Sequence, residues 1–322
     1  MEEKRFVKDL VEGEKISSAF FISFKRPVQC YAKGYWFELR VGDRTGEIPA
    51  KYWGGRSEEA VQAISDSLKE GDIVLVSGTV QRYRDRLEIS ANPEDRQGVK
   101  KLQPGEYDIG HFVAVTDKNI PEMFNRVLEW IGSVQDQNIK RLLENIFLDP
   151  ELSERFQKCP AAIKHHGNVV GGLMEHTLAT LDICHAMQGI YPDLNRDLLI
   201  AGALLHDIGK VDEYQVSTRI SASDPGRLIG HIYLGAEMVR IQIAKMTDFP
   251  ENLAWKLTHT ILSSHGALEY GSPVAPMFPE ALAISLADEA EARMDKMLRL
   301  MRSTRTEDDW TYREDVGSVY LK

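Results

Sequence analysis

An adjacent histidine and aspartate, His206 and Asp207, are the residues of this sequence whose position most favours chemistry. They follow a run, 198–205, that the spacing predicts to be a helix apolar on nearly all sides. Such a helix lies deep in a domain, where a buried imidazole and carboxylate need a polar partner. A metal cation is a suitable partner, because these two ligand types together suit Mn²⁺, Fe²⁺, Co²⁺ or Zn²⁺.

Four further polar side chains stand where helical periodicity expects apolar ones: His176, His231, His265 and Asp288. A single buried histidine is more often a hydrogen-bonded core residue than a ligand, and a single aspartate can pair with an arginine. Six such residues on five predicted helices are harder to explain as core. Together they predict a metal centre.

The remaining histidines and the cysteines carry weaker signals. His111 and His185 have no comparable context and are expected to be structural. His259 lies six positions before His265 and therefore points to another helix face, so it is an outside candidate. The three cysteines are far apart and odd in number, which favours buried or idle thiols over disulfides or a zinc knuckle.

Helices are needed to position these residues, and the second part of the chain has a helical pattern. Apolar residues recur there at three- and four-residue spacing, which predicts an all-helical domain. Helices are expected over residues 121–131, 138–147, 151–158, 172–187, 197–206, 228–246, 251–264 and 279–301.

The first hundred residues have the pattern of β-structure instead. Short segments rich in β-branched and aromatic residues, separated by turn signals, predict strands over 19–24, 34–41, 47–53, 73–80 and 86–91. A helix is expected over 58–68, between the third and fourth strands. This order is the layout of an OB-fold barrel, with other five-stranded barrels as the alternative. The polar segment 97–110 is predicted to be a linker, which gives an OB-fold domain over 1–103 and a helical domain over 104–322.

Length and charge agree with two domains and limit the partners. The 322 residues suggest about two domains, and the net charge of −10 argues against a nonspecific polyanion binder. Residues 1–100 hold 17 basic and 17 acidic side chains, so the rest of the chain carries the whole deficit. No apolar run is long enough to span a bilayer, and no signal peptide is recognisable, so we expect a cytoplasmic protein without a membrane partner.

The order of histidines and aspartates resembles that of the HD-domain metal-dependent phosphohydrolases. More closely, the chain is similar to the 3′→5′ exoribonucleases that join an N-terminal OB-fold to an HD domain. The segments that carry the resemblance are HHGNVVGGLMEHT (165–177), YPDLNRDLLIAGALLHDIGKVDEY (191–214), IGHIYLGAEMV (229–239) and HTILSSHGALEYGSPVAPMFPEALAISLADEAEARMD (259–295). The motif GALEYGSPV followed by LADEAEARMD is more telling than the His-Asp pair.

The resemblance implies two divalent ions in one active site. His176, His206, Asp207 and Asp288 would bind the first ion. His231 and His265, with Asp207 bridging, would bind the second. Some HD domains have two adjacent histidines where this chain has Ser264-His265, and this departure affects the second site. Mn²⁺ is favoured, with Fe²⁺, Co²⁺, Mg²⁺ or Zn²⁺ as alternatives.

A two-ion site suits hydrolysis of a phosphodiester bond. Asp207 is expected to be catalytic because it would bridge the ions and hold the attacking water in line. Lys210 matches the family lysine that contacts the substrate phosphate, although a cation at a helix C-terminus is also favoured by the helix dipole. His165 and His166 lie in a glycine-rich stretch and are candidates to contact phosphate or to protonate the leaving group.

The barrel is expected to hold the substrate through aromatic stacking and nearby cations. The candidate residues are Tyr35, Trp53, Arg82, Tyr83 and Arg84. Because side chains alternate along a strand, about half of the barrel aromatics are expected to fill the core instead. The partner would be single-stranded RNA, with single-stranded DNA as a second candidate.

Two other functions compete with an exoribonuclease. An HD phosphohydrolase for a nucleotide or a cyclic dinucleotide would hydrolyse small molecules and leave oligonucleotides intact. An RNA-binding adaptor with a structural metal is the third possibility, and it would be supported if changing Asp207 to alanine left every hydrolytic activity intact. The full ligand set and Lys210 disfavour it. The sequence leaves open a homo-oligomer and the role of the polar tail 304–322.

Overall fold

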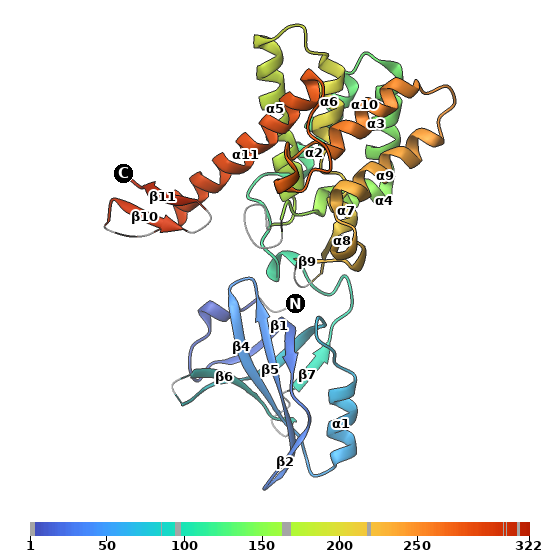
Figure 1. Ribbon diagram of the computed structural model, residues 1–322. Helices are drawn as coiled ribbons and strands as arrows, with labels where there is room; N and C mark the ends of the chain where they lie inside the picture. Colours follow the sequence, from blue (N-terminus) through green and yellow to red (C-terminus); the bar gives the residue numbers. More distant parts are fainter. Residues whose placement is uncertain are drawn as a thin grey trace. The chain divides into compact units, whose positions relative to one another are not determined.

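The structure is a computed structural model, which describes residues 4–84, 86–93, 98–162, 169–217, 220–304, 306, 308–313 and 316–322 (Figure 1). The chain divides into two compact units. The first consists chiefly of the residues up to Ala114, and the second chiefly of those from Val115 onward. Each unit has a hydrophobic core of its own.

The first unit is built on a seven-stranded sheet. Its strands are β1 (Lys15–Lys25), β2 (Gln29–Tyr31), β3 (Gly34–Asp43), β4 (Gly46–Trp53), β5 (Ile73–Tyr83), β6 (Arg86–Ala91) and β7 (Gly98–Lys101). Helix α1 (Glu58–Asp66) lies between β4 and β5, and short 3₁₀ turns occupy Val7–Asp9 and Ile109–His111. Ser57 begins α1, since its side chain accepts a hydrogen bond from the amide of Ala60.

Five of these strands pair in a closed cycle. Neighbours pair in the order β1-β3-β4-β6-β5, and β5 pairs again with β1. The β4–β6 pair is parallel, whereas the other four pairs are antiparallel. Alternation along β3 explains the core, because Phe37, Leu39 and Val41 are fully buried and the residues between them face the other side. This is the strand and helix order predicted for an OB-fold barrel.

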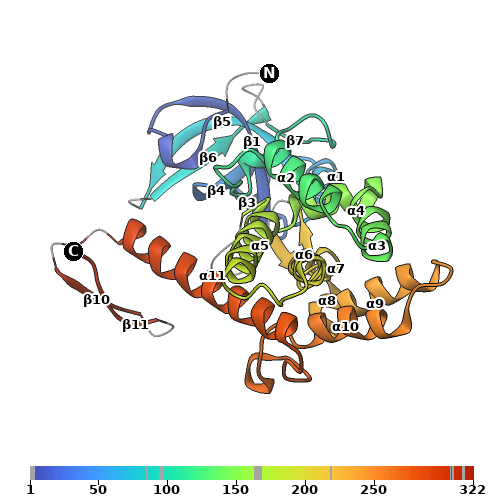
Figure 2. The same cartoon turned by 90° about the horizontal axis from the view of Figure 1, so that it is seen from above.

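The second unit is mainly helical (Figure 2). Its helices are α2 (Ile120–Gly132), α3 (Gln137–Phe147), α4 (Pro150–Lys158), α5 (Gly172–Ile190), α6 (Arg196–Leu205), α7 (Lys210–Glu213), α8 (Asp224–Leu228), α9 (His231–Ala244), α10 (Glu251–Leu262) and α11 (Pro279–Ser303). A further 3₁₀ turn spans Leu268–Tyr270. Two antiparallel hairpins are formed by β8 (Tyr214–Val216) with β9 (Ile220–Ala222) and by β10 (Trp310–Arg313) with β11 (Gly317–Tyr320).

Helix α6 is the centre of this unit. Every residue from Leu198 to Leu205 is buried, as the apolar run predicts, and α5, α10 and α11 pack around it. The Asn195 side chain caps the helix by accepting hydrogen bonds from two amides of its first turn. Gly202 lets α11 approach closely, because a Cβ there would lie 2.1 Å from Cδ1 of Ile284.

The structure corrects three expectations about elements. The helix expected over 228–246 is α9 and begins only at His231, because Gly230 adopts a positive φ of 82° and separates it from the short helix α8. The segment expected to be a linker contains β7, which pairs with β5. The second unit includes two hairpins in addition to its helices. In the described part of the chain, no helix combines the length and the apolar character that crossing a bilayer requires.

Candidate metal centre

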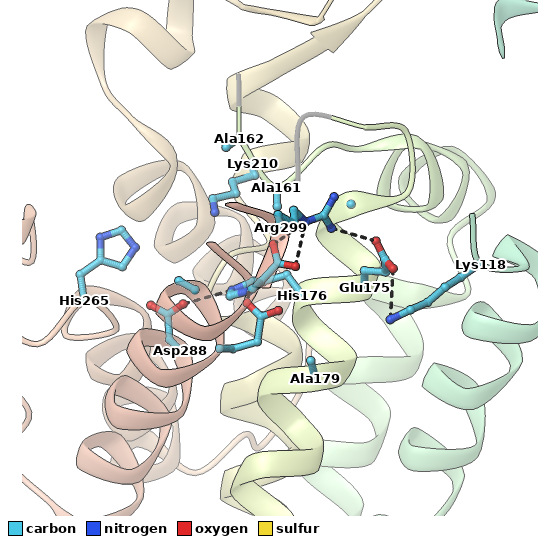
Figure 3. A pocket seen from close by; sticks show the side chains of 14 residues that line it. Lys118, Ala161, Ala162, Glu175, His176, Ala179, Lys210, His265, Asp288 and Arg299 are labelled. Carbon is cyan, nitrogen blue, oxygen red and sulfur yellow. Dashed lines mark hydrogen bonds and ion pairs between the residues drawn. The ribbon is translucent and has the colours of Figure 1, made fainter. Parts of the chain in front are cut away.

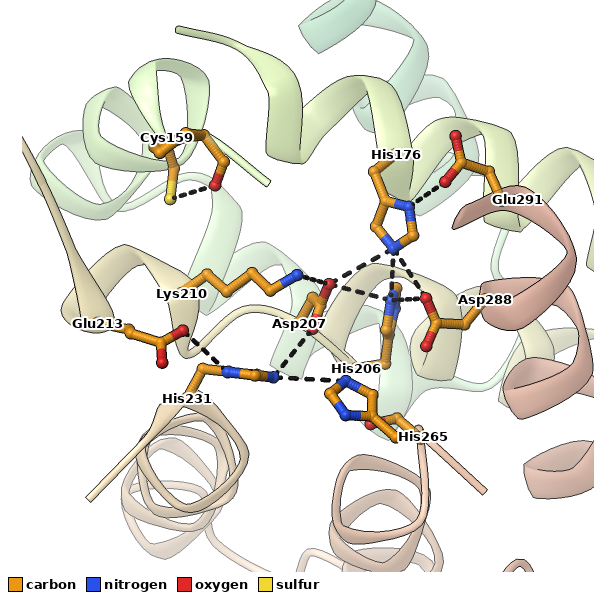
Figure 4. A network of polar contacts seen from close by, with 12 residues as sticks. Cys159, His176, His206, Asp207, Lys210, Glu213, His231, His265, Asp288 and Glu291 are labelled. Carbon is orange, nitrogen blue, oxygen red and sulfur yellow. Dashed lines mark hydrogen bonds and ion pairs between the residues drawn. The ribbon is translucent and has the colours of Figure 1, made fainter. Parts of the chain in front are cut away.

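The structure brings all six predicted ligands together in the helical unit (Figure 4). They come from five different segments: His176 from α5, His206 and Asp207 from the end of α6, His231 from the first position of α9, His265 from the turn after α10, and Asp288 from α11. His206 is fully buried and Asp207 is 2% exposed. The apolar helix α6 therefore carries the two most buried polar residues of the centre at its end.

The first group consists of His176, His206, Asp207 and Asp288. Nε2 of His176 lies 3.2 Å from Nε2 of His206 and 3.1 Å from Oδ1 of Asp288. Oδ2 of Asp207 lies 3.4 Å from the first imidazole and 3.5 Å from the second. Donor atoms of His176, His206 and Asp207 therefore lie close to one another, and Asp288 adjoins the two imidazoles.

The second group shares Asp207 through its other oxygen. Oδ1 of Asp207 lies 3.5 Å from Nε2 of His231, and that nitrogen lies 3.4 Å from Nε2 of His265. Asp207, His231 and His265 thus form a second set of three donors. Three protein ligands leave coordination positions open for water or a substrate oxygen.

This donor set fits divalent cations. Metal–ligand bonds of about 2.0–2.2 Å place neighbouring donors about 3.0–3.6 Å apart, close to the spacing found here. Oδ1 of Asp207 is buried and has no hydrogen-bond partner among the described residues, an arrangement that is costly unless a cation lies beside it. Imidazole and carboxylate donors together suit transition-metal ions and Mn²⁺.

Each of the four imidazoles has an oxygen atom close to its Nδ1, and its Nε2 faces the centre. Nδ1 of His176 hydrogen-bonds Glu291, and Oε2 of Glu213 lies 2.8 Å from Nδ1 of His231. The carbonyl oxygens of Ala203 and Tyr270 lie 2.8 and 3.0 Å from the Nδ1 atoms of His206 and His265. An Nδ1–H bond of this kind fixes the tautomer in which Nε2 is the ligand atom.

The electrostatics of the centre favour positive charge. Burial alone would lower the pKa of His176, but Asp207, Asp288 and Glu291 raise it well above its ordinary value. Burial likewise would raise the pKa of Asp207, but Lys210 and His206 lower it well below the ordinary value. Carboxylates gathered at this density need cations to offset their charge.

Lys210 is the first residue of α7 and supplies one such cation. Its Nζ lies 2.6 Å from Oδ2 of Asp207, and its side chain is 12% exposed. Burial alone would lower the pKa of Lys210, but the charge of Asp207 raises it. The ammonium group therefore stays charged beside Asp207.

Gly209 lets α7 approach α9. A Cβ at this position would lie 2.0 Å from the carbonyl oxygen of His231 and 2.4 Å from the amide nitrogen of Gly235. Both contacts are with backbone atoms, which cannot rotate away. Gly209, two residues after Asp207, therefore permits the close approach of α7 to α9, the helix that begins at His231.

The other predicted histidines have different surroundings. His165 and His166 lie outside the described residues. Nε2 of His259 accepts a hydrogen bond from the amide of Met277, so this outside candidate is used structurally. His185 packs edge-on against Trp130, and His111 against Phe6, in line with structural roles.

Of the five substrate contacts predicted in the barrel, Tyr35 and Arg82 have partners within the barrel itself. Tyr35 packs against the barrel core, and a hydrogen bond with Glu58 raises its pKa. Arg82 pairs with Glu12 at 3.0 Å. Arg84 lies 5.3 Å from the ring of Tyr83, which is 52% exposed.

Trp53 belongs to a larger group that we name the aromatic strip: Tyr31, Trp36, Lys51, Trp53 and Tyr83. Trp53 stacks on Trp36 at 5.2 Å between ring centroids and contacts Tyr31 edge-on at 5.2 Å. Lys51 Nζ lies 4.5 Å from the ring centroid of Tyr83 and 5.8 Å from that of Trp36. The strip crosses β2, β3, β4 and the end of β5 on one surface of the barrel.

Sequence reasoning missed Trp36, Lys51, Glu213 and Glu291. Strand alternation could have found the first two: Phe37 and Leu39 are inward-facing, so Trp36 must face outward together with its β4 partner Trp53. The two glutamates carried no such signal, because acidic residues on helices are ordinary surface residues.

Comparisons with known proteins agree with this architecture. The family model described as HD domain matches residues 173–293, and the one described as OB-fold nucleic acid binding domain matches residues 22–93. Three curated relatives named 3′-5′ exoribonuclease YhaM are similar over most of their length. That of Bacillus subtilis is 32% identical, over 82% of this chain and 80% of the relative. Those of Geobacillus and Listeria welshimeri are 30% identical, covering 83% and 94% of this chain and 79% and 93% of theirs. The predicted OB-fold followed by an HD domain is thereby confirmed.

Proposed function

The chain belongs to the family of the 3′-5′ exoribonuclease YhaM, and from this we propose that its metal centre removes nucleotides one at a time from the 3′ end of single-stranded RNA. The proposal depends on one observation: the two carboxylate oxygens of Asp207 belong to different donor sets. Its Oδ2 faces His176 and His206, whereas its Oδ1 faces His231 in the set that also contains His265.

Two divalent ions, preferably Mn²⁺, would occupy the centre. His176, His206, Asp207 and Asp288 would hold the first, and Asp207, His231 and His265 would hold the second. When bound, such ions activate water and stabilise negative charge on phosphoryl oxygens. Fe²⁺, Co²⁺, Mg²⁺ or Zn²⁺ would satisfy the same donors, and the assay below distinguishes them by activity.

The protein residues orient the reactants around this centre. The buried Asp207 fixes the relative position of the two donor sets, so water and phosphate meet in a defined geometry. Lys210 is placed to offset charge on a nonbridging phosphate oxygen. His165 and His166 are proposed as further phosphate contacts or as the group that protonates the leaving oxygen.

The barrel would bind a single-stranded segment of the substrate. The aromatic strip offers two stacked indoles and neighbouring phenol rings, which suit the bases of single-stranded nucleic acids; the ammonium of Lys51 is paired with Glu88 at 2.7 Å and orders the strip rather than binding the backbone. Trp53 and Tyr83 belong to the strip, with Arg84 next to Tyr83; Tyr35 and Arg82 are proposed as secondary contacts. Single-stranded DNA would stack on the same rings. A homo-oligomer and a cytoplasmic location remain predictions.

The test is incubation of 5′-labelled single-stranded RNA with the full-length protein and each divalent ion. A descending ladder that ends in short products is expected with Mn²⁺, and circular RNA of the same sequence should stay intact. Asp207→Asn should abolish the ladder, whereas Asp182→Asn, which changes an exposed carboxylate on α5 outside the centre, should not. Intact linear RNA together with hydrolysed nucleotides or cyclic dinucleotides would contradict the proposal.

A further inference from the structure

A cavity of about 310 Å³ adjoins the metal centre. It lies between α5 and α11, and at one end it is lined by His176, Lys210, His265 and Asp288 (Figure 3). Small side chains leave the space open along its length: Ala161, Ala162, Ala179 and Ala292 all line it. The cavity therefore extends the active site away from the ligands.

Residues on one face of α11 line this cavity along its length. Asp288, Glu291, Asp295 and Arg299 all line it, at the three-, four- and seven-residue spacings that share a helix face. At a rise of 1.5 Å per residue, the backbone of Arg299 lies about 16 Å along the helix from that of Asp288. Helical side chains lean toward the N-terminus, so the guanidinium group of Arg299 leans back toward the centre.

Two cations from different segments meet at this far end. Nζ of Lys118, from the segment before α2, lies 3.1 Å from Oε1 of Glu175, and Arg299 lies 3.8 Å from Oε2 of the same carboxylate. Asp295 fixes the guanidinium group further, since Nε of Arg299 lies 2.8 Å from both of its oxygens. Figure 3 shows Glu175 between the two cations, away from Asp288 and His265.

These cations are held in place but remain accessible. The side chain of Arg299 is 40% exposed and that of Lys118 is 61% exposed, whereas that of Glu175 is 15% exposed. The carboxylate of Glu175 thus holds the two cations next to each other. A planar guanidinium with an ammonium beside it suits a phosphate group.

We propose that Arg299 and Lys118 form a subsite for a backbone phosphate of the RNA strand, upstream of the phosphate that is hydrolysed. The proposal rests on the proposed exoribonuclease function. Because the cavity runs from the metal ligands to these cations, a strand bound in it would place one phosphate at the centre and a second one beside Arg299 and Lys118. The subsite would therefore favour polymers over mononucleotides, and binding would weaken when the strand becomes too short to reach Arg299.

The experiment compares two substrates with Mn²⁺ present: a 5′-labelled oligoribonucleotide and bis(p-nitrophenyl) phosphate, which has no upstream phosphate. For Arg299→Ala and Lys118→Ala, the ratio of the oligonucleotide kcat/KM to that of the small substrate should fall about tenfold, mainly through KM. The slope of log kcat/KM against log salt should also become shallower, by about 0.7 for one lost phosphate contact. Arg293→Ala is the matched control, since this exposed arginine of α11 pairs with Glu289 outside the cavity.

Arg299→Lys distinguishes the effect of charge from that of packing, because lysine keeps the positive charge. Its ratio of kcat/KM values should lie between those of Arg299→Ala and the wild type. An unchanged ratio and salt slope in Arg299→Ala, with wild-type protein still degrading RNA from the 3′ end, would overturn the subsite alone. Equal losses on both substrates would also overturn it, because they would show that the ion pairs only support the fold. If wild-type protein hydrolyses the small substrate but no RNA, the exoribonuclease proposal itself fails.

Discussion

At the scale of single residues, each donor set is supported by one glutamate. Glu291 holds Nδ1 of His176, and Glu213 lies against Nδ1 of His231. A carboxylate in this position fixes the ring and makes its other nitrogen a better donor. The two glutamates therefore act as positioning residues, each on one set.

We expect Glu291→Gln to weaken Mn²⁺ binding at the first donor set by about tenfold or more, because an amide orients the imidazole without a negative charge. Glu213→Gln should weaken the second set by a similar factor. Titration calorimetry with Mn²⁺ measures both affinities without reference to catalysis. Glu289→Gln, a change in an exposed residue of the same helix that pairs with Arg293, is the control. Unaltered binding in both variants would show that the glutamates do not position the ligands.

The six candidate ligands could be predicted because each breaks an apolar pattern. Asp288, for example, interrupts the apolar stretch of ALAISLAD, whereas Glu291 follows it in the acidic stretch DEAEA, where a charged residue is unremarkable. The role of Glu291 depends on which imidazole faces α11, and that is a fact of packing between α5 and α11. Residue pattern alone cannot supply it.

At the scale of elements, most helices and strands could be predicted from periodicity. Helix α6, for example, is apolar on nearly all sides, and β3 has apolar residues on alternate positions. The break between α8 and α9 could not be predicted from periodicity. Apolar residues continue through it, and only the backbone conformation of Gly230 changes the direction of the chain. The short helix α7 and the hairpins were also missed. Elements of three to five residues are too short for a periodic signal.

Close packing of α7 on α9 gives a prediction at this scale. Gly209→Ala should lower the free energy of unfolding by about 1–3 kcal/mol, because its methyl group would collide with the backbone of His231 and Gly235. It should also weaken Mn²⁺ binding at the second donor set. Urea unfolding and calorimetry measure the two effects. Gly189→Ala in α5 is the control, since a Cβ there meets nothing within 4 Å and alanine favours a helix. Equal stability of both variants would contradict the account.

At the scale of the whole molecule, the two units have separate cores, and the ligands all lie in one of them. Differential scanning calorimetry should therefore show that Mn²⁺ raises the Tm of the helical unit and leaves that of the barrel unchanged. At an ion concentration of about 100 times Kd, one bound ion adds about 2.7 kcal/mol. EDTA should reverse the shift, and Asp207→Asn should remove most of it. A parallel shift of both transitions would show that the ions do not act through this centre.

The last ligand of the centre, Asp288, comes from α11, whereas the barrel is complete before the first helix of the second unit begins. During synthesis on the ribosome, domains fold in order from the N-terminus. The nascent chain can therefore form its nucleic-acid-binding barrel well before it can assemble a cutting site. The metal centre therefore lacks Asp288 until translation has passed α11.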